Sequence, residues 1–239
     1  LDMQYFGLYG ACSTMVEALI LASMSIDGEF AQKALAVTSS HFCTAERQFR
    51  FPLEYGNQRT PTSQWTVTGA GCALLSGGNE IGFPRIVEVC PGSICDLGVT
   101  DINNMGAAMA PAAAATLKRF FSDTATMPDD YDLIITGDLG HIGHRLTEQI
   151  LLKEGIRMKG NFQDCGIVIY NAEKQDCHAG GSGCGCCASV LCGYILPAMQ
   201  TKNLYKNILV IATGALMSPT TTLQGESIPG IAHLVHITM

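Results

Sequence analysis

The chain has 239 residues, of which 47% are hydrophobic and only 15% are charged, and this composition excludes an intrinsically disordered protein. Its 14 Lys and Arg against 21 Asp and Glu give a net charge of -7 without a basic block, so we expect no nucleic-acid partner. The longest apolar stretches, 16–22 and 190–199, fall short of the roughly 20 residues of a membrane span. No signal-peptide pattern opens the chain. We therefore expect neither a transmembrane segment nor secretion.

The 11 cysteines predict free thiols in a reducing compartment. Their number is odd, and five of them crowd between Cys177 and Cys192, which is not the pattern of a disulfide framework. This run lacks the paired Cys-x2-Cys spacing of zinc sites, and His141 and His144 with Asp138 form an equally weak metal pattern. We expect compact packed thiols here and no metal site.

Buried strands that alternate with amphipathic helices predict an α/β protein with helix-covered sheets. The expected elements of the first part are a helix over 15–26 ended by Gly28, a strand over 33–38, and adjacent strands over 65–76 and 86–90. Those of the second part are an Ala-rich helical region from 101 to about 121 with Pro111 inside it, strands over 131–137, 165–170 and 206–212, and helices over 145–154 and 184–199.

One helix and strand unit occurs twice in this sequence. Shifting its first copy by 173 positions aligns, without a gap, Gly10 with Gly183, Cys12 with Gly185, Lys33 with Lys206, Leu35 with Ile208 and Val37 with Val210. Because helix and strand keep the same register together, we interpret the pattern as an internal duplication.

Cys12 is the best single candidate for chemistry. It lies in a Gly-Ala-Cys-Ser turn before an expected helix, where the positive end of the helix dipole lowers the pKa of a thiol and favours the nucleophilic thiolate. The alternative is a small buried core thiol, because free cysteine is among the most buried residue types. The sequence leaves both interpretations open.

Several short strings together resemble one superfamily, the thiolases and ketoacyl synthases. They are Gly10-Ala-Cys-Ser13, Thr68-Gly-Ala-Gly71, Thr136-Gly-Asp138 and Gly180-Gly-Ser-Gly-Cys184, in a duplicated layout. More narrowly, the chain resembles the family of stage V sporulation protein AD from about Tyr5 to His233. The strings that carry this resemblance are Thr38-Ser-Ser-His41, Thr44-Ala-Glu-Arg-Gln-Phe-Arg-Phe-Pro52, Glu54-Tyr-Gly56, Met109-Ala-Pro-Ala112, Ala212-Thr-Gly-Ala215 and Ile228-Pro-Gly-Ile-Ala-His233.

The resemblance implies a five-layer αβαβα fold with two pseudo-symmetric halves, here residues 1–95 and 96–239. Members of this family carry further sequence before the first residue of this chain, so we expect the first half to lack its N-terminal part. The resemblance also implies a homodimer, which is common among thiolase-like proteins. Its functional implication is the handling of dipicolinic acid, which developing endospores import and release at germination.

A comparison with condensing enzymes predicts that this fold has lost condensation chemistry. Where type III ketoacyl synthases carry a histidine after the strand, this chain has Gly137, and where they carry an asparagine, it has Cys184. Loss of one oxyanion donor costs roughly a hundredfold or more in rate. We expect Cys12, Gly137, Asp138, Gly183 and Cys184 to line a binding cleft without catalysis. The rival hypothesis is an acyl or ketoacyl transferase that uses Cys12 on a coenzyme A thioester.

The string from Thr44 to Pro52 predicts the positive end of this cleft. Arg47 and Arg50 lie three residues apart on an expected short helix over 45–51, with His41 just upstream. Two guanidiniums on one face can hold planar carboxylates by forked hydrogen bonds, although such arginines can equally pair with nearby acids. Arg59 and Trp65 are further candidates for the same pocket.

Together these features predict a binding protein for dipicolinic acid that needs no cofactor, with calcium as a possible companion of the ligand. Since the sequence offers no membrane anchor, we expect it to act at the cytoplasmic face of the developing spore's membrane, held there by the other stage V sporulation A proteins.

Overall fold

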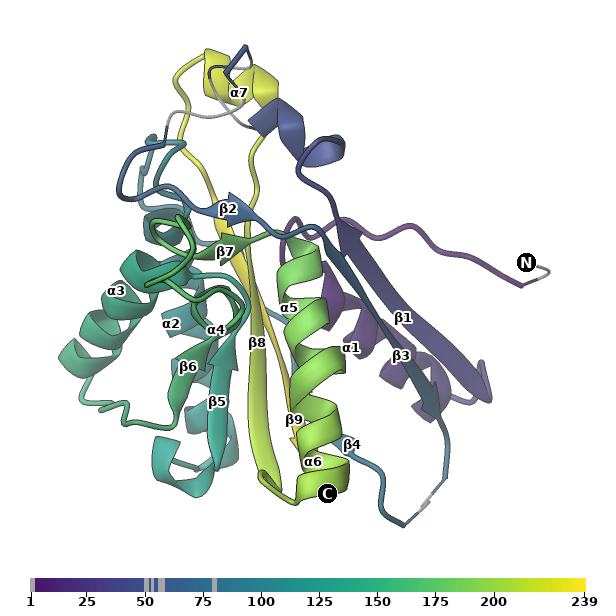
Figure 1. The fold of residues 1–239 in the computed structure, drawn as a ribbon. Coiled ribbons are helices and arrows are strands. Elements are labelled where there is room, and N and C mark those ends of the chain that lie inside the picture. Colours follow the sequence, from purple (N-terminus) through teal and green to yellow (C-terminus); the bar gives the residue numbers. More distant parts are fainter. Residues whose placement is uncertain (1–2, 50–51, 53, 56–58, 79–80) are drawn as a thin grey trace.

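A computed structural model of the chain describes residues 3–49, 52, 54–55, 59–78 and 81–239. Its core is a five-stranded mixed sheet in the order β4-β9-β8-β5-β6 (Figure 1). The strands are β4 (Arg85–Cys90), β5 (Leu133–Thr136), β6 (Phe162–Asp164), β8 (Asn207–Ala215) and β9 (Gly230–Thr238). Strand β5 is parallel to both β6 and β8, whereas β9 is antiparallel to β8 and β4.

Two long helices cover one face of this sheet. Helix α2 (Met105–Thr124) runs through Pro111 without a break, and α3 (Gly140–Lys153) crosses it where Gly106 and Gly143 meet. A Cβ atom added to Gly106 would lie 2.8 Å from the amide nitrogen of Gly143, so glycine lets the two backbones touch. Helix α2 buries most of its alanines, and Phe120, against β8 and β9.

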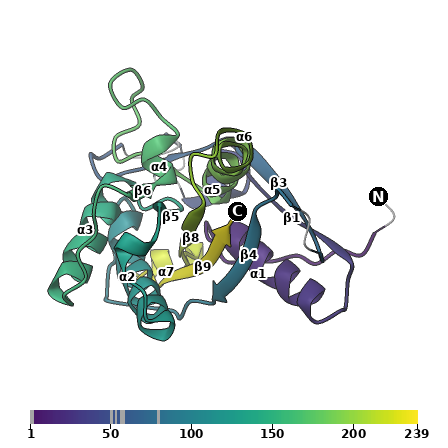
Figure 2. The same ribbon diagram turned by 90° about the horizontal axis from the view of Figure 1, so that it is seen from below.

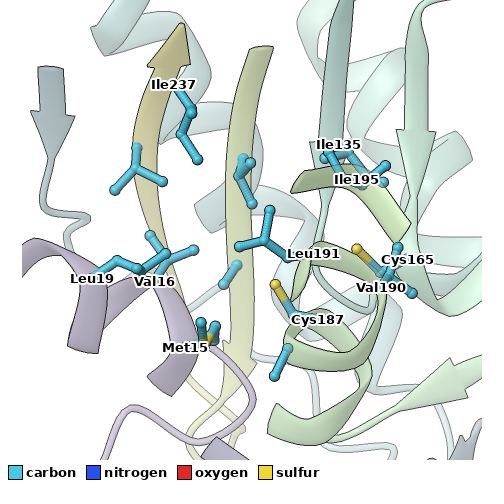
Figure 3. Close-up of a cluster of buried hydrophobic side chains, with 14 of the residues drawn as sticks. Met15, Val16, Leu19, Ile135, Cys165, Cys187, Val190, Leu191, Ile195 and Ile237 are labelled. Atoms are coloured by element: carbon cyan, nitrogen blue, oxygen red, sulfur yellow. The ribbon is translucent and has the colours of Figure 1, made fainter. Parts of the chain in front are cut away.

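The duplicated helices cover the other face. Helix α1 (Thr14–Asp27) and the continuous run of α5 (Cys184–Val190), a π-helical turn (Leu191–Ile195) and α6 (Leu196–Lys202) form one layer. Figure 3 shows Met15, Val16 and Leu19 of α1 and Cys187 and Leu191 of the second run meeting in one apolar cluster. Side chains of the five-stranded sheet complete this cluster, which joins the two copies of the unit.

A second, two-stranded sheet packs on these helices. It consists of β1 (Lys33–Ser40) and the antiparallel β3 (Gly69–Ser76), which lie beside α5 in Figure 1. Gly71 packs on α5, because a Cβ atom there would lie 2.4 Å from the carbonyl oxygen of Ala188. Leu35, Val37 and Leu74 are exposed on the outer face, which no helix of the described residues covers. Figure 2 shows the resulting four layers of helices, sheet, helices and sheet.

The helix and strand duplication is confirmed by the structure, because α1 with β1 and α5 to α6 with β8 repeat the same order. Among the residues that the structure describes, only the stretch Cys184–Lys202 has the length and apolar character of a membrane span. Half of its apolar window is buried inside the protein, as in an ordinary core helix, so it is weak support for a span.

Three predictions of secondary structure were wrong. Residues 165–170 are not a strand, because the Asp164 carboxylate caps a helical turn, α4 (Cys165–Val168), by accepting from the Ile167 amide. The predicted strand over 65–76 is two strands in different sheets, β2 (Trp65–Thr66) and β3, and neither is a neighbour of β4: β3 pairs with β1, and β4 pairs with β9. Helix α3 begins at Gly140 and not near Arg145, so His141 and His144 lie inside its first turns. The boundary at residue 95 stays a prediction.

Candidate functional site

Three chain turns meet at the ends of the central helices. Cys12 lies in the turn before α1, Asp138 follows β5, and Gly183 precedes α5. A two-residue parallel ladder between β2 (Trp65–Thr66) and β7 (Gly181–Ser182) holds the last of these turns. The Sγ atom of Cys12 lies 4.0 Å from the Oγ atom of Ser182, so residues far apart in sequence meet in one cluster, here called the Cys12 cluster.

Asp138 lies at the centre of the Cys12 cluster. Its side chain is fully buried and accepts hydrogen bonds from the Gly183 amide at 3.0 Å, the Thr213 hydroxyl at 2.9 Å and the Ser182 hydroxyl at 3.2 Å. The Cys12 thiol is a further hydrogen-bond partner. All these donors are uncharged, so they solvate the carboxylate without neutralising it. The pKa of Asp138 is accordingly raised by burial, and the hydrogen bonds offset only part of that rise.

The same carboxylate acts on the thiol of Cys12. Burial raises the pKa of Cys12 well above its usual range, and the charge of Asp138 and the hydrogen bond to it raise it further. The Gly183 amide lowers this pKa, but its effect is the smaller one. The expectation that a helix N-terminus lowers the pKa of this thiol is therefore wrong, because burial and, after it, the anion beside the sulfur outweigh the backbone dipoles.

Two residues that sequence reasoning missed fix the position of Asp138. The carboxylate of Asp164 accepts hydrogen bonds from the Leu139 amide at 2.8 Å and the Gly140 amide at 3.0 Å, and so holds the turn that follows Asp138. Burial raises the pKa of Asp164 to about 6. The buried amide of Gln64 donates to the carbonyl oxygens of Asp138 at 2.7 Å and Gly181 at 2.9 Å. Neither residue stands in a motif, so its sequence neighbours give no signal of this role.

Gly137 and Cys184 are the sequence neighbours of Asp138 and Gly183. The thiol of Cys184 donates to the Ser39 carbonyl at 3.1 Å, and burial raises its pKa to about 11. The charges of Glu46 and Asp138 act in the same direction, which places Cys184 within electrostatic reach of both. Gly137 packs on β8, because a Cβ atom there would lie 3.0 Å from the Cα atom of Ala212.

The basic string lies next to Cys184. His41 is exposed, and its Nδ1 atom accepts from the Cys43 amide at 3.1 Å. The following turn is a short 3-10 helix, η1 (Ala45–Phe49), with Glu46 near Cys184 and with Arg47 over the ring of Phe42. Arg50 lies outside the described residues. The structure thus brings Cys12, Asp138, Gly183 and Cys184 together and places η1 on the Cys184 side.

His141 and His144, the two histidines that follow β5, lie in the first turns of α3. His144 stacks on Phe162 of β6 with ring centroids 4.2 Å apart. His141 follows the glycine turn, where its amide donates to the Ala179 carbonyl at 2.8 Å, and the Arg145 side chain in turn donates to the carbonyl of His141. The charged group that bonds the Cys12 thiol is the carboxylate of Asp138.

The sequence matches the family described as Stage V sporulation protein AD over residues 1–238. The chain belongs to this family. It is 46% identical over 233 residues to stage V sporulation protein AD of Bacillus subtilis (strain 168), an alignment that covers 98% of this chain and 68% of that protein. It is thus a chain of the sporulation system, and its relative is longer.

Solved structures show that the fold of this family member is thiolase-like. The tetronic acid condensing enzyme AbyA1 matches with a TM-score of 0.58 and 15% identity, over 97% of this chain and 67% of its own. The 3-oxoacyl-[acyl-carrier-protein] synthase III of Aquifex aeolicus VF5 matches with a TM-score of 0.59 and 13% identity, over 98% and 67%. At such identities the likeness establishes the fold alone. Four layers of the expected five-layer arrangement are present in the described residues.

Proposed function

We propose that this protein is a non-catalytic binding protein for dipicolinic acid, which acts in the uptake of that acid into endospores or in its release from them. The observation that carries the non-catalytic part is the contact of Asp138 with both the Cys12 thiol and the Gly183 amide. A condensing enzyme needs a thiolate nucleophile and free donors for the thioester oxyanion. Here the thiol is kept protonated and the amide is already bonded to a carboxylate.

The charges of Asp138 and Arg47 support an orientation for the ligand. Dipicolinate is a planar dianion, and the buried carboxylate of Asp138 repels it from the Cys12 end. Arg47 supplies a guanidinium on the η1 side, where a forked pair of hydrogen bonds suits a carboxylate. We therefore propose that the ligand binds by its carboxylates at η1 and presents its ring towards Cys12.

Calcium is proposed as a companion of the ligand and not as a resident ion. Among the residues that the structure describes, no group of three or more His, Cys, Asp or Glu side chains is placed to hold a metal. A calcium ion would take two carboxylate oxygens and the ring nitrogen from dipicolinate and fill its remaining positions largely with water, and its charge would offset the repulsion by Asp138.

The partners follow from family membership and remain part of the proposal. We propose that the protein works at the cytoplasmic face of the spore membrane, bound to other stage V sporulation A proteins, and that it is a homodimer. The exposed apolar side chains of Leu35, Val37 and Leu74 offer a surface that packing would stabilise. Sedimentation of the full-length protein tests the dimer.

The test of binding is calorimetric titration of dipicolinate into the full-length protein, with and without calcium. We expect saturable binding that Arg47→Ala weakens at least tenfold. Arg119→Ala is the matched control, because Arg119 pairs with Asp123 on the exposed side of α2. Equal affinities for the wild-type protein and the Arg47→Ala variant would remove η1 from the site, and no binding by the folded wild-type protein would reject the proposal.

The competing function is acyl transfer through Cys12, which is favoured by the condensing enzymes among the structural neighbours. Mass spectrometry of the protein after incubation with acyl coenzyme A thioesters distinguishes the two. A stable acyl group on Cys12 would support the transferase. We expect Cys12 to remain unmodified, since its thiol pKa is raised.

A further inference from the structure

Four planar side chains pack together near the Cys12 cluster, and we call them the column: the rings of Phe42 and Trp65 and the guanidiniums of Arg47 and Arg59. The rings of Phe42 and Trp65 stack with centroids 4.8 Å apart and an angle of 7° between their planes. The guanidinium of Arg47 lies over the ring of Phe42, 5.8 Å from its centroid, and that of Arg59 lies over the ring of Trp65, 5.0 Å from its centroid. Both distances are within the roughly 6 Å reach of a cation–π contact.

One end of this column is fixed to the body of the protein. Arg59 donates from Nη1 to the carboxylate of Asp176 at 2.6 Å and from Nη2 to the carbonyl of the same residue at 2.5 Å. Trp65 belongs to β2, and its amide donates to the Gly180 carbonyl at 2.9 Å. Both residues are thus tied to the loop that leads into β7, so the Trp65 ring is a rigid support for Phe42.

Two residues of the column have sequence neighbours that lie at the proposed ligand site. Thr66, the residue after Trp65, pairs with Ser182, whose hydroxyl contacts Asp138. Arg47 follows Glu46 on η1, and Glu46 is within electrostatic reach of Cys184. The column therefore runs from a fixed ion pair on one side to the guanidinium that we place against the ligand.

We propose that Phe42 and Trp65 are positioning residues that fix the plane of the Arg47 guanidinium and so make the site select planar aromatic carboxylates over flexible aliphatic ones. This inference rests on the proposed function. A forked pair of hydrogen bonds places the guanidinium and carboxylate in one plane. In dipicolinate the carboxylates are conjugated with the ring, so a fixed guanidinium plane also fixes the plane of the ring, whereas an aliphatic chain can rotate to suit any plane.

The experiment compares two dicarboxylates on three proteins. Dipicolinate and glutarate both separate their carboxylates by three atoms, but only dipicolinate is planar. Phe42→Leu removes the ring, Phe42→Tyr keeps it, and Phe30→Leu is the matched control at an exposed phenylalanine. Calorimetry gives the affinities, and the fluorescence of Trp65, the only tryptophan of the chain, reports on the stack itself.

We expect Phe42→Leu to weaken dipicolinate about tenfold and to leave glutarate nearly unchanged, which reduces the preference for the aromatic ligand. Phe42→Tyr should restore the wild-type affinity within about threefold, and dipicolinate should change Trp65 emission in the wild-type protein but not in Phe42→Leu. Equal affinities for dipicolinate in the wild-type protein and Phe42→Leu would overturn the inference alone. Equal losses in Phe42→Leu and Phe42→Tyr would do the same, by assigning Phe42 a purely structural role. Failure of the wild-type protein to bind dipicolinate would instead overturn the proposed function, and this inference with it.

Discussion

The two copies of the helix and strand unit share a backbone plan but differ in their surroundings. Strand β8 has a neighbour on each side and is buried along both faces, whereas β1 has one neighbour and alternates buried with exposed residues. Val37 and Val210 correspond between the copies, yet Val37 is 57% exposed and Val210 is fully buried. The burial of a strand residue therefore depends on the neighbouring strands and helices as much as on the residue itself.

The starts of the two helices also differ in their charged neighbours. The Gly183 amide, just before α5, donates to the buried carboxylate of Asp138, which belongs to neither copy, whereas Glu17 of α1 buries a carboxylate oxygen of its own. After burial, the charge of Asp138 is the next cause of the raised pKa of Cys12, so one carboxylate acts on both copies. Four experiments would test this comparison.

The stability of the protein should fall as the pH rises from about 4 to about 6. Burial raises the pKa of Asp164 from 3.8 to about 6. The folded state therefore binds a proton that the unfolded state has released, and this stabilisation is full below pH 3.8 and is lost as the pH passes 6. The change from Asp164 is about 3 kcal/mol. Urea unfolding across this range should show a flatter pH dependence for Asp164→Asn. The same slope in Asp164→Asn and in the control Asp129→Asn would contradict the prediction.

Placing a side chain at Gly185 should be nearly as costly. Gly185 corresponds to Cys12, but a Cβ atom at Gly185 would lie 2.4 Å from the Gly69 carbonyl oxygen and 2.7 Å from the Ser40 amide nitrogen. Backbone on both sides must move, so Gly185→Ala should lower the free energy of unfolding by about 3 kcal/mol, measured by urea denaturation. Gly193→Ala is the control, because a Cβ atom there meets nothing within 4 Å. A neutral Gly185→Ala would show that the contact is loose.

The paired valines give the most direct test of the comparison. Val210→Ala removes buried methyl groups and should cost about 2 kcal/mol, whereas Val37→Ala should cost less than about 1 kcal/mol because Val37 is already half solvated. Thermal or urea unfolding of the two variants measures both values. Equal losses would mean that the outer face of β1 is covered in solution, for example by a second copy.

The smallest effect concerns the thiol. Asp138→Asn removes the anion that raises the pKa of Cys12, so alkylation of Cys12 at pH 8 should become about tenfold faster. Peptide mapping by mass spectrometry separates Cys12 from the other thiols, and Asp132→Asn serves as the control at an exposed position. An unchanged rate would show that access, not charge, limits the reactivity of Cys12.

The sequence predicted much of the fold correctly where all residues of a strand are buried. The runs that became β5 and β8 are apolar on both faces, and the helix starting at Cys184 follows a glycine turn that its copy shares. Features that depend on contacts between distant segments were predicted less well. The strand predicted at 165–170 is a helical turn because Asp164 caps it, and Gly166 packs against the Gly181 carbonyl, a contact between distant segments.

The site could be predicted only in part from the sequence. Motifs identified Cys12, Asp138 and Gly183 as candidates, and the structure brings these residues together. The motifs gave the wrong direction for the pKa of Cys12, because a local turn shows the helix dipole but neither the burial of the thiol nor an anion 126 residues away. Gln64 and Asp164 were missed because their role is to hold other backbone groups in place.

The pairing of β2 with β7 and of β4 with β9 has a consequence for any separation of the chain into pieces. A cut after residue 95 would leave β2 and β4 on one fragment and their hydrogen-bond partners on the other. Each fragment alone would carry open strand edges that invite aggregation. If the two fragments are mixed before either aggregates, they should associate through these same edges. Reassembly of the two fragments would then report on the folding of the protein.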